Sequence, residues 1–517
     1  MEITQTNYAC TPENIAALIA QNIKLTEENL QLKVRLKTAE KNISLLIEQI
    51  KLGRQRQFGK KTETSNQLEL EFVFDEDDTL NQDEAETEEE EATETLTYTR
   101  KKKTTGRKLD TTNLPREQII HDLSDADKCC GQCGKELVKF GEDHSEQLEY
   151  IPATLKVIEH ISYKYTCRHC ETVITAAKPE MPIAKSMAAP SLITEVIIKK
   201  FEHHLPWYRQ SKIFTQDGLD IPANTICNWY LQAGEVLAPL KIALFAQLDK
   251  IHILQADETT VKLLKEDLKG YMWCYHSLEF NNRFLLFEYN DSRGGAVVNN
   301  TLNNYRGLLQ TDGYSGYNEF RHKVGVVNLG CWAHCRRKFA EIVKIATSAG
   351  KAHEVVKWIA KLYAIEAEAK ALCLGFAERK ALREQKAAPI LDKIHELVSQ
   401  AKPSTKSALG AAITYTLNQW PYLIKYIEHG EAEIDNNWCE NQIRPFAIGR
   451  KNWMFLGNER SAHTAAFFYS IIQTCRINQI DPRKYLIYVL SQAGNMRRGA
   501  VNPTDLLPQY IDKSLLV

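Results

Sequence analysis

The chain has 517 residues, of which 44% are hydrophobic and 25% are charged, and its net charge is −1 at neutral pH. This length predicts several domains, and the composition is that of a soluble globular protein. No apolar run approaches the roughly 20 residues that a transmembrane helix needs, and the first residues lack the features of a secretory signal. We therefore expect a cytoplasmic protein without a membrane partner.

Residues 13–50 carry a heptad repeat without glycine or proline, which predicts a coiled coil of the leucine-zipper type. One heptad position holds Ile15, Asn22, Asn29, Leu36, Ile43 and Ile50, and the other holds Leu18, Leu25, Leu32, Ala39 and Leu46. Asparagines that pair across the seam favour a parallel homodimer, or a larger assembly. The alternative is a helix that packs on its own globular domain.

Residues 62–108 are strongly acidic and poor in aromatic side chains, and they end in a basic run that begins at Arg100. Such a composition cannot build a core, so it predicts a disordered linker. Most of the acid lies within residues 69–94, and the rest of the chain is basic. The net charge therefore does not exclude double-stranded DNA as a partner.

Two C-x-x-C pairs fall within residues 109–180, a segment with short strand-like pieces. The cysteines are Cys130, Cys133, Cys167 and Cys170. Four thiolates on two turns can enclose one tetrahedral Zn²⁺, which would stabilise a domain with few core residues. We therefore predict a structural zinc site, with free thiols as the alternative.

Residues 190–240 are predicted to form three helices, and the last two are joined by a short turn that contains Gly218. This order is typical of a helix-turn-helix, whose final helix enters the major groove of DNA. Three short helices without DNA contact are the alternative.

From residue 250 the pattern changes to short apolar runs that predict strands of a mixed α/β sheet. We expect one catalytic core in two parts, residues 250–335 and 435–475, separated by a helical insertion at 336–430 and followed by a C-terminal segment at 476–517. The fold class is therefore a multidomain α and α/β protein.

Three carboxylates stand out. Asp257 and Asp312 each follow an apolar run that predicts a buried strand, and Glu440 lies on a predicted helix one turn before Arg444. An acid at the end of a buried strand projects from the sheet edge, where α/β proteins place their chemistry. Two aspartates and a glutamate suit Mg²⁺ better than Zn²⁺. Asp312 can instead cap the element that follows it.

Long motifs in this order resemble those of the insertion sequence 66 family of bacterial transposases. The motifs are 435–455 (DNNWCENQIRPFAIGRKNWMF), 331–339 (CWAHCRRKF), 205–210 (LPWYRQ), 145–150 (SEQLEY) and 481–486 (DPRKYL). The resemblance implies a ribonuclease H-like catalytic domain of the DDE type, preceded by zipper, zinc-binding and helix-turn-helix domains. It also implies binding to the element's terminal inverted repeats, small accessory proteins as partners, and a nucleoid-associated location.

On this basis Asp257, Asp312 and Glu440 would hold two Mg²⁺ ions for DNA cleavage and strand transfer. Arg444 and Lys451 would lie near the scissile phosphate.

Other side chains of these motifs have two alternative roles. His334, with Arg336 and Arg337, would approach the same cleft, although a core position fits His334 equally well. Arg450, Lys451 and Trp453 suit unstacked DNA ends, unless Trp453 packs inward. The competing functions are a zinc-dependent DNA-binding regulator on an inactive scaffold and a nuclease that cuts without joining.

Overall fold

The structure is a computed structural model that describes residues 12–58, 155–166, 173–176, 180–184, 186–264 and 269–516. Contacts divide the chain into two units, Met1–Glu69 with Val157–Val517, and Leu70–Lys156. Nearly all described residues belong to the first unit. The predicted linker at 62–108 and the four predicted zinc ligands lie outside the described residues.

The N-terminal helix α1 (Pro12–Phe58) is uninterrupted, which confirms the predicted helix and extends it beyond residue 50. Its apolar seam is exposed, at 47% for Leu25 and 60% for Leu32. Helices of this kind gain most of their stability from packing an apolar face, and α1 has no such cover along this seam. Pairing with a second chain remains a prediction.

The other elements follow in chain order. The helices are α2 (Pro190–Phe201), α3 (Trp207–Gln216), α4 (Ala223–Val236), α5 (Ala238–Phe245), α6 (Gly295–Thr301), α7 (Trp332–Ile345), α8 (Lys351–Ala371), α9 (Phe376–Lys386), α10 (Ala388–Ser399), α11 (Ala408–Leu423), α12 (Asn437–Trp453), α13 (Glu459–Ile477), α14 (Pro482–Ser491) and α15 (Ala493–Arg497). The strands are β1 (Lys164–Thr166), β2 (Val173–Thr175), β3 (Ile253–Lys262), β4 (Lys269–Ser277), β5 (Leu285–Asn290), β6 (Gly307–Gln310) and β7 (Val326–Leu329).

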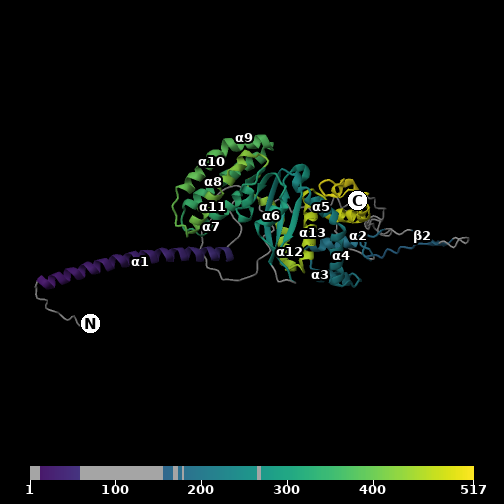
Figure 1. The fold of residues 1–517 in the computed structure, drawn as a ribbon, viewed down its shortest axis with the longest axis horizontal. Helices are drawn as coiled ribbons and strands as arrows, with labels where there is room; N and C mark the ends of the chain where they lie inside the picture. The colour runs from purple at the N-terminus through teal and green to yellow at the C-terminus, as the bar shows by residue number, and fades with distance from the viewer. Residues whose placement is uncertain are drawn as a thin grey trace, which may run out of the picture. The chain divides into compact units, whose positions relative to one another are not determined.

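A five-stranded mixed sheet has the order β5-β4-β3-β6-β7, in which β3 runs antiparallel to β4 and parallel to β6. The helices α12 and α13 pack against this sheet (Figure 1). The edge strand β5 donates backbone N–H groups to the hydroxyls of Ser470 and Thr474 on α13. These hydrogen bonds occupy donors that an open sheet edge would leave unpaired.

The start of β6 requires glycine. Gly307 has φ +136°, and a Cβ there would overlap the backbone oxygen of His252. Only glycine adopts this conformation without strain, so Gly307 sets the close approach that begins the β3–β6 pairing.

The three helices predicted within residues 190–240 are present as α2, α3 and α4. They share a small core that includes Val196, Phe214 and Ile226, and Asn224 and Asn228 are exposed on α4. The helical arrangement is thus as expected, whereas contact with DNA remains a prediction.

The predicted helical insertion is also present, as α7 to α11, and it has a core of its own (Figure 1). It begins at Trp332, slightly before the predicted boundary. On α10 the buried side is formed by Leu391, Ile394 and Val398, whereas Ile390 and Leu397 are half-buried.

The C-terminal part is helical, and α13 continues to Ile477, across the predicted boundary at residue 475. Within the described ranges, the structure contains no helix that is both long and apolar enough to span a membrane.

Candidate active site

Two of the predicted carboxylates lie where the parallel pairing of β3 and β6 stops. The last pair in this register is Gln255 with Gln310, and Asp257 and Asp312 each follow two residues later. The prediction that the first strand ends before Asp257 is wrong, because β3 continues to Lys262 in antiparallel pairing with β4. Asp257 therefore extends from the middle of a strand, which holds it more rigidly than a loop would.

The third carboxylate, Glu440, lies in the first turn of α12. A buried glutamine on β3 fixes the start of this helix. Gln255 donates a hydrogen bond to the backbone oxygen of Asp435 (2.8 Å) and accepts one from the N–H of Cys439 (3.0 Å). Because Gln255 precedes Asp257 by two residues on the same strand, it links the placement of Glu440 to that of Asp257.

The three carboxylates influence one another electrostatically. Burial raises the pKa of Asp257 well above its usual value, and the negative charges of Glu258, Glu440 and Asp312 raise it further. A buried carboxylate among other carboxylates is costly to ionise unless a cation balances the charge. A set of carboxylate oxygens is the donor set that Mg²⁺ prefers. The residues present therefore fit a magnesium site.

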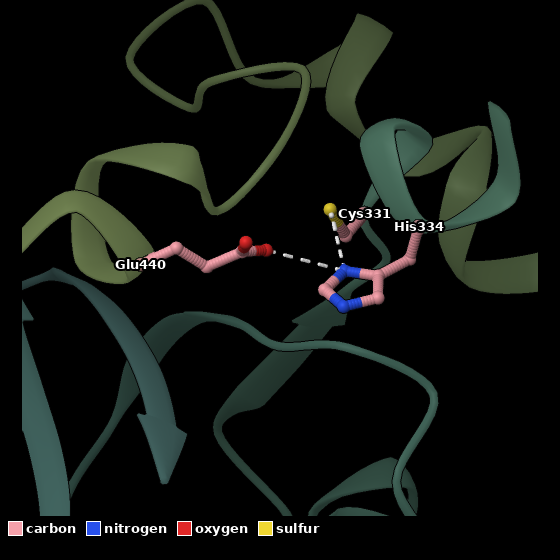
Figure 2. Close-up of side chains that lie close together, drawn as sticks. All are labelled: Cys331, His334 and Glu440. Atoms are coloured by element: carbon pink, nitrogen blue, oxygen red, sulfur yellow. Dashed lines mark hydrogen bonds and ion pairs between the residues drawn. The ribbon is translucent and has the colours of Figure 1, made fainter. Parts of the chain in front are cut away.

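Glu440 also contacts two side chains of α7, His334 and Arg337, and the contact with His334 can be followed in Figure 2. His334 Nδ1 lies 3.4 Å from Glu440 Oε1 and 3.3 Å from the sulfur of Cys331, and Arg337 donates to Glu440 Oε2 at 3.2 Å. Burial lowers the pKa of His334, and the charge of Glu440 opposes that shift. His334 thus lies beside Glu440, and its side chain is partly exposed rather than fully buried in the core.

A fourth carboxylate, Glu258, was not singled out from the sequence. Its side chain is 2% exposed, accepts hydrogen bonds from Arg293 (2.7 and 2.9 Å) and from the hydroxyl of Tyr317 (3.0 Å), and lies next to Asp257 in the chain. Burial raises the pKa of Glu258, and the Arg293 hydrogen bond opposes that shift. In the sequence, the only sign that Glu258 belongs to this group of carboxylates is its position directly after Asp257.

Arg293 connects Glu258 to the second aspartate. Its guanidinium lies 4.0 Å from the ring centroid of Tyr314, whose backbone N–H donates to Asp312 Oδ1 at 2.9 Å. Asp312 therefore closes the turn at Tyr314, but it does not cap the short 3-10 helix that follows (Ser315–Arg321), whose N-cap residue Tyr314 has no side-chain cap. One oxygen of Asp312 is engaged in this turn, and the exposed Arg293 brings a positive charge near Glu258 and Asp312.

The basic residues predicted on α12 separate into two groups. Arg444 is exposed one turn after Glu440, whereas Lys451 lies about 16 Å further along the helix axis than Glu440. Arg450 donates to Thr259 and Thr260 of β3, and Trp453 is 5% exposed. The prediction that Arg450 and Trp453 face unstacked DNA is wrong, because both pack inward.

Of the region of the predicted zinc site, the structure describes the two short strands β1 and β2. The hairpin of β1 and β2 is antiparallel, and the chain between its strands includes the second C-x-x-C pair. The residues that would bind zinc lie outside the described ranges, namely Cys130, Cys133, Cys167 and Cys170.

Comparison with known proteins shows which family has this sequence. Residues 185–464 match the model described as "Transposase IS66 family", which covers more than half of the chain and includes all three carboxylates. The chain belongs to the IS66 transposase family. Residues 127–171 match the zinc-finger binding domain of transposase IS66, and residues 45–119 match "Transposase C of IS166 homeodomain".

Relatives of this IS66 family member extend along most of its length. Uncharacterized protein y4hP of Sinorhizobium fredii is 31% identical over 76% of this chain and 75% of its own length. Uncharacterized protein y4jD of the same organism is 31% identical over 74% of this chain and 77% of its own. Together with the zinc-finger and homeodomain matches, the family assignment indicates a DNA-binding, DNA-processing protein.

Proposed function

We propose that this IS66 family member is a DDE transposase, which binds the terminal inverted repeats of its element and catalyses Mg²⁺-dependent DNA cleavage and strand transfer. The observation that supports the proposal is that the negative charges of Asp312 and Glu440 both raise the pKa of Asp257, although Asp257 lies on β3, Asp312 follows β6, and Glu440 is in the first turn of α12. A structural role alone would not favour three mutually repelling carboxylates.

The proposed catalytic core is ribonuclease H-like. The strand order β5-β4-β3-β6-β7, with only β3–β6 and β6–β7 parallel, supports this assignment. The helices α7 to α11 would then be the insertion between the second aspartate and the glutamate, as the family resemblance implies.

When bound, Mg²⁺ ions would supply Lewis acidity to the attacking and leaving oxygens of the phosphodiester. Asp257 and Asp312 would bind them from the sheet, and Glu440 from α12. Arg337 orients Glu440 directly, through a hydrogen bond to its carboxylate. Gln255 orients Glu440 indirectly, because it accepts a hydrogen bond from the N–H of Cys439 at the start of the same helix. Such preorganisation lowers the cost of assembling the site around DNA.

Basic side chains near the carboxylates would contact the DNA backbone. Arg293 and Arg444 are exposed beside the carboxylates, where a cation would neutralise charge on the scissile phosphate. Lys451, further along α12, would contact a more distant phosphate.

End recognition would use α4, where Asn224 and Asn228 are exposed four residues apart on one side of the helix. Asparagine pairs well with adenine in the major groove.

The zinc domain would bind one Zn²⁺ through its four predicted cysteines, and α1 would form a homodimer. Small accessory proteins of the same element are further expected partners.

The test is a strand-transfer assay on labelled DNA that carries the ends flanking the gene, with supercoiled plasmid as target. Wild-type protein should give joined products with Mg²⁺, and Glu440→Gln should give none while it still binds the ends. End binding without cleavage by either protein would favour the regulator. Cleavage without joined products would favour the simple nuclease.

A further inference from the structure

We propose that Cys331, His334 and Glu440 form a second metal site, selective for a borderline transition metal such as Zn²⁺, that shares Glu440 with the proposed magnesium site. The ligand atoms of these three side chains all lie within 4.8 Å of one another. No other group of three such side chains in the described residues comes as close. The carboxylates Asp257, Asp312 and Glu440 do not form such a group of closely spaced ligand atoms.

Two of the three ligand separations match a tetrahedral ion. With Zn–N bonds of about 2.0 Å and Zn–S bonds of about 2.3 Å, tetrahedral ligand atoms lie about 3.3 to 3.6 Å apart. His334 Nδ1 lies 3.3 Å from Cys331 Sγ and 3.4 Å from Glu440 Oε1, and the third separation, between Cys331 Sγ and Glu440, is within 4.8 Å. The Nδ1 atom of His334 faces both other side chains (Figure 2).

The two oxygens of Glu440 have different partners. Glu440 Oε1 is buried and accepts no hydrogen bond from the described residues, whereas Oε2 accepts one from Arg337. The neighbour of Oε1 is His334 Nδ1 at 3.4 Å, which carries a positive charge only when the imidazole is protonated. An ion held between Oε1, Nδ1 and Sγ would give Oε1 a positively charged partner.

Local backbone geometry brings the ligands together. Cys331 is the N-cap residue of α7 and His334 lies in its first turn, three residues on, so both side chains fall on one side of the helix. Glu440 is in the first turn of α12. Two helix N-termini thus converge, and their partial positive charge favours a thiolate and a carboxylate.

The ligand set decides which metal binds. One sulfur and one imidazole nitrogen favour Zn²⁺ or another borderline ion over Mg²⁺, which prefers oxygen alone. Binding would release the thiol proton of Cys331 to solvent. Three protein ligands leave a fourth position for water, as in zinc sites that are not purely structural.

Occupation of this site would turn Glu440 away from magnesium and inhibit DNA cleavage. This consequence rests on the proposed function, whereas the metal site itself does not. The chain would then respond to the supply of transition metals in the cell.

The first experiment counts bound zinc in the full-length protein after equilibration with a Zn²⁺ buffer. The zinc-finger domain contributes equally to every variant, so differences report the second site. Cys331→Ser and His334→Gln should each hold one equivalent less than wild type. Asp257→Asn and the matched thiol control Cys475→Ser, a buried cysteine of α13, should hold the same as wild type.

Equal zinc content in wild type, Cys331→Ser and His334→Gln would overturn the site. Loss of the equivalent in Asp257→Asn as well would assign the ion to the magnesium site and overturn it too. Because two different ligand variants are compared, misfolding of one of them does not decide the result. The zinc count also needs no catalytic activity.

The second experiment measures Mg²⁺-dependent cleavage with and without added Zn²⁺, as a ratio within each variant. Zinc should slow wild-type cleavage by at least about tenfold and slow Cys331→Ser by less than about twofold. An equal ratio in both would overturn the inhibitory role. Absence of cleavage in wild type would instead contradict the proposed function and leave the zinc count unaffected.

Discussion

The carboxylate of Asp435 is 6% exposed and joins the helical insertion to the start of α12. It accepts hydrogen bonds from the hydroxyl of Tyr363 (2.7 Å) and from the backbone of Asn437 (3.1 Å). Burial nevertheless raises its pKa from 3.8 to about 6. The folded protein therefore holds this proton more tightly than the unfolded chain does.

This shift predicts a pH dependence of stability. Asp435 destabilises the fold as pH rises from its unfolded pKa through about 6, because ionisation then occurs more easily in the unfolded chain. Asp435→Asn removes the dependence, so its free energy of unfolding relative to wild type should increase by about 1 kcal/mol between about pH 5 and about pH 7.5. Denaturant unfolding at both pH values measures the difference. A relative free energy that stays constant or decreases would show that Asp435 is not shifted upward.

At the scale of elements, one buried arginine of α9 binds the segment 426–432, which leads into α12. Arg383 is fully buried, bonds to Glu366 at 2.8 Å, and donates to the backbone oxygens of Tyr426, His429 and Ala432 at 2.7 to 2.8 Å. Every donor has an acceptor, which is the condition under which a buried ion pair is tolerated.

Arg383→Met should therefore lower the free energy of unfolding by about 3 to 5 kcal/mol, because three backbone oxygens lose their donor and Glu366 keeps only Arg379 as a partner. Lys386→Met on the same helix removes a pair with Glu368 whose side chains are 44% and 39% exposed, and should cost less than about 1 kcal/mol. Urea unfolding compares the two. Similar losses in both variants would contradict the role given to Arg383.

Helices and strands were predictable where their signal is local. The heptads of α1 and the short apolar runs of β3 and β6 each depend on neighbouring residues, and all three elements have the expected type. The end of β3 was missed because pairing with β4 overrides the change to polar residues at Asp257.

The site was predictable only through the family motifs. Gln255 binds a backbone group 180 positions away, and no local pattern records such a contact. Trp453 and Arg450 were assigned to DNA from residue type alone, whereas their inward packing depends on tertiary neighbours. Arg293 stands in a polar loop without any periodic signal, so its contact with Glu258 could not be predicted.

For the whole molecule, the exposed seam of α1 predicts self-association. Leu25→Asp together with Leu32→Asp places charges at two seam positions, which should convert dimers or larger assemblies into monomers. Sedimentation velocity measures the change, and Lys24→Asp with Lys33→Asp, outside the two heptad positions, is the matched control. A monomeric wild-type protein, or equal assembly of the seam variant, would contradict the coiled coil.

The central claim is that Asp257, Asp312 and Glu440 form a Mg²⁺-dependent site that cuts DNA. The most direct measurement is single-turnover cleavage of an element-end DNA by wild type, Asp257→Asn and the control Asp291→Asn, an exposed aspartate. Asp257→Asn should lose at least about a thousandfold in rate while retaining end binding, because a metal ligand is removed. Asp291→Asn should cleave as wild type does. Cleavage by Asp257→Asn at the wild-type rate would contradict the assignment of the site.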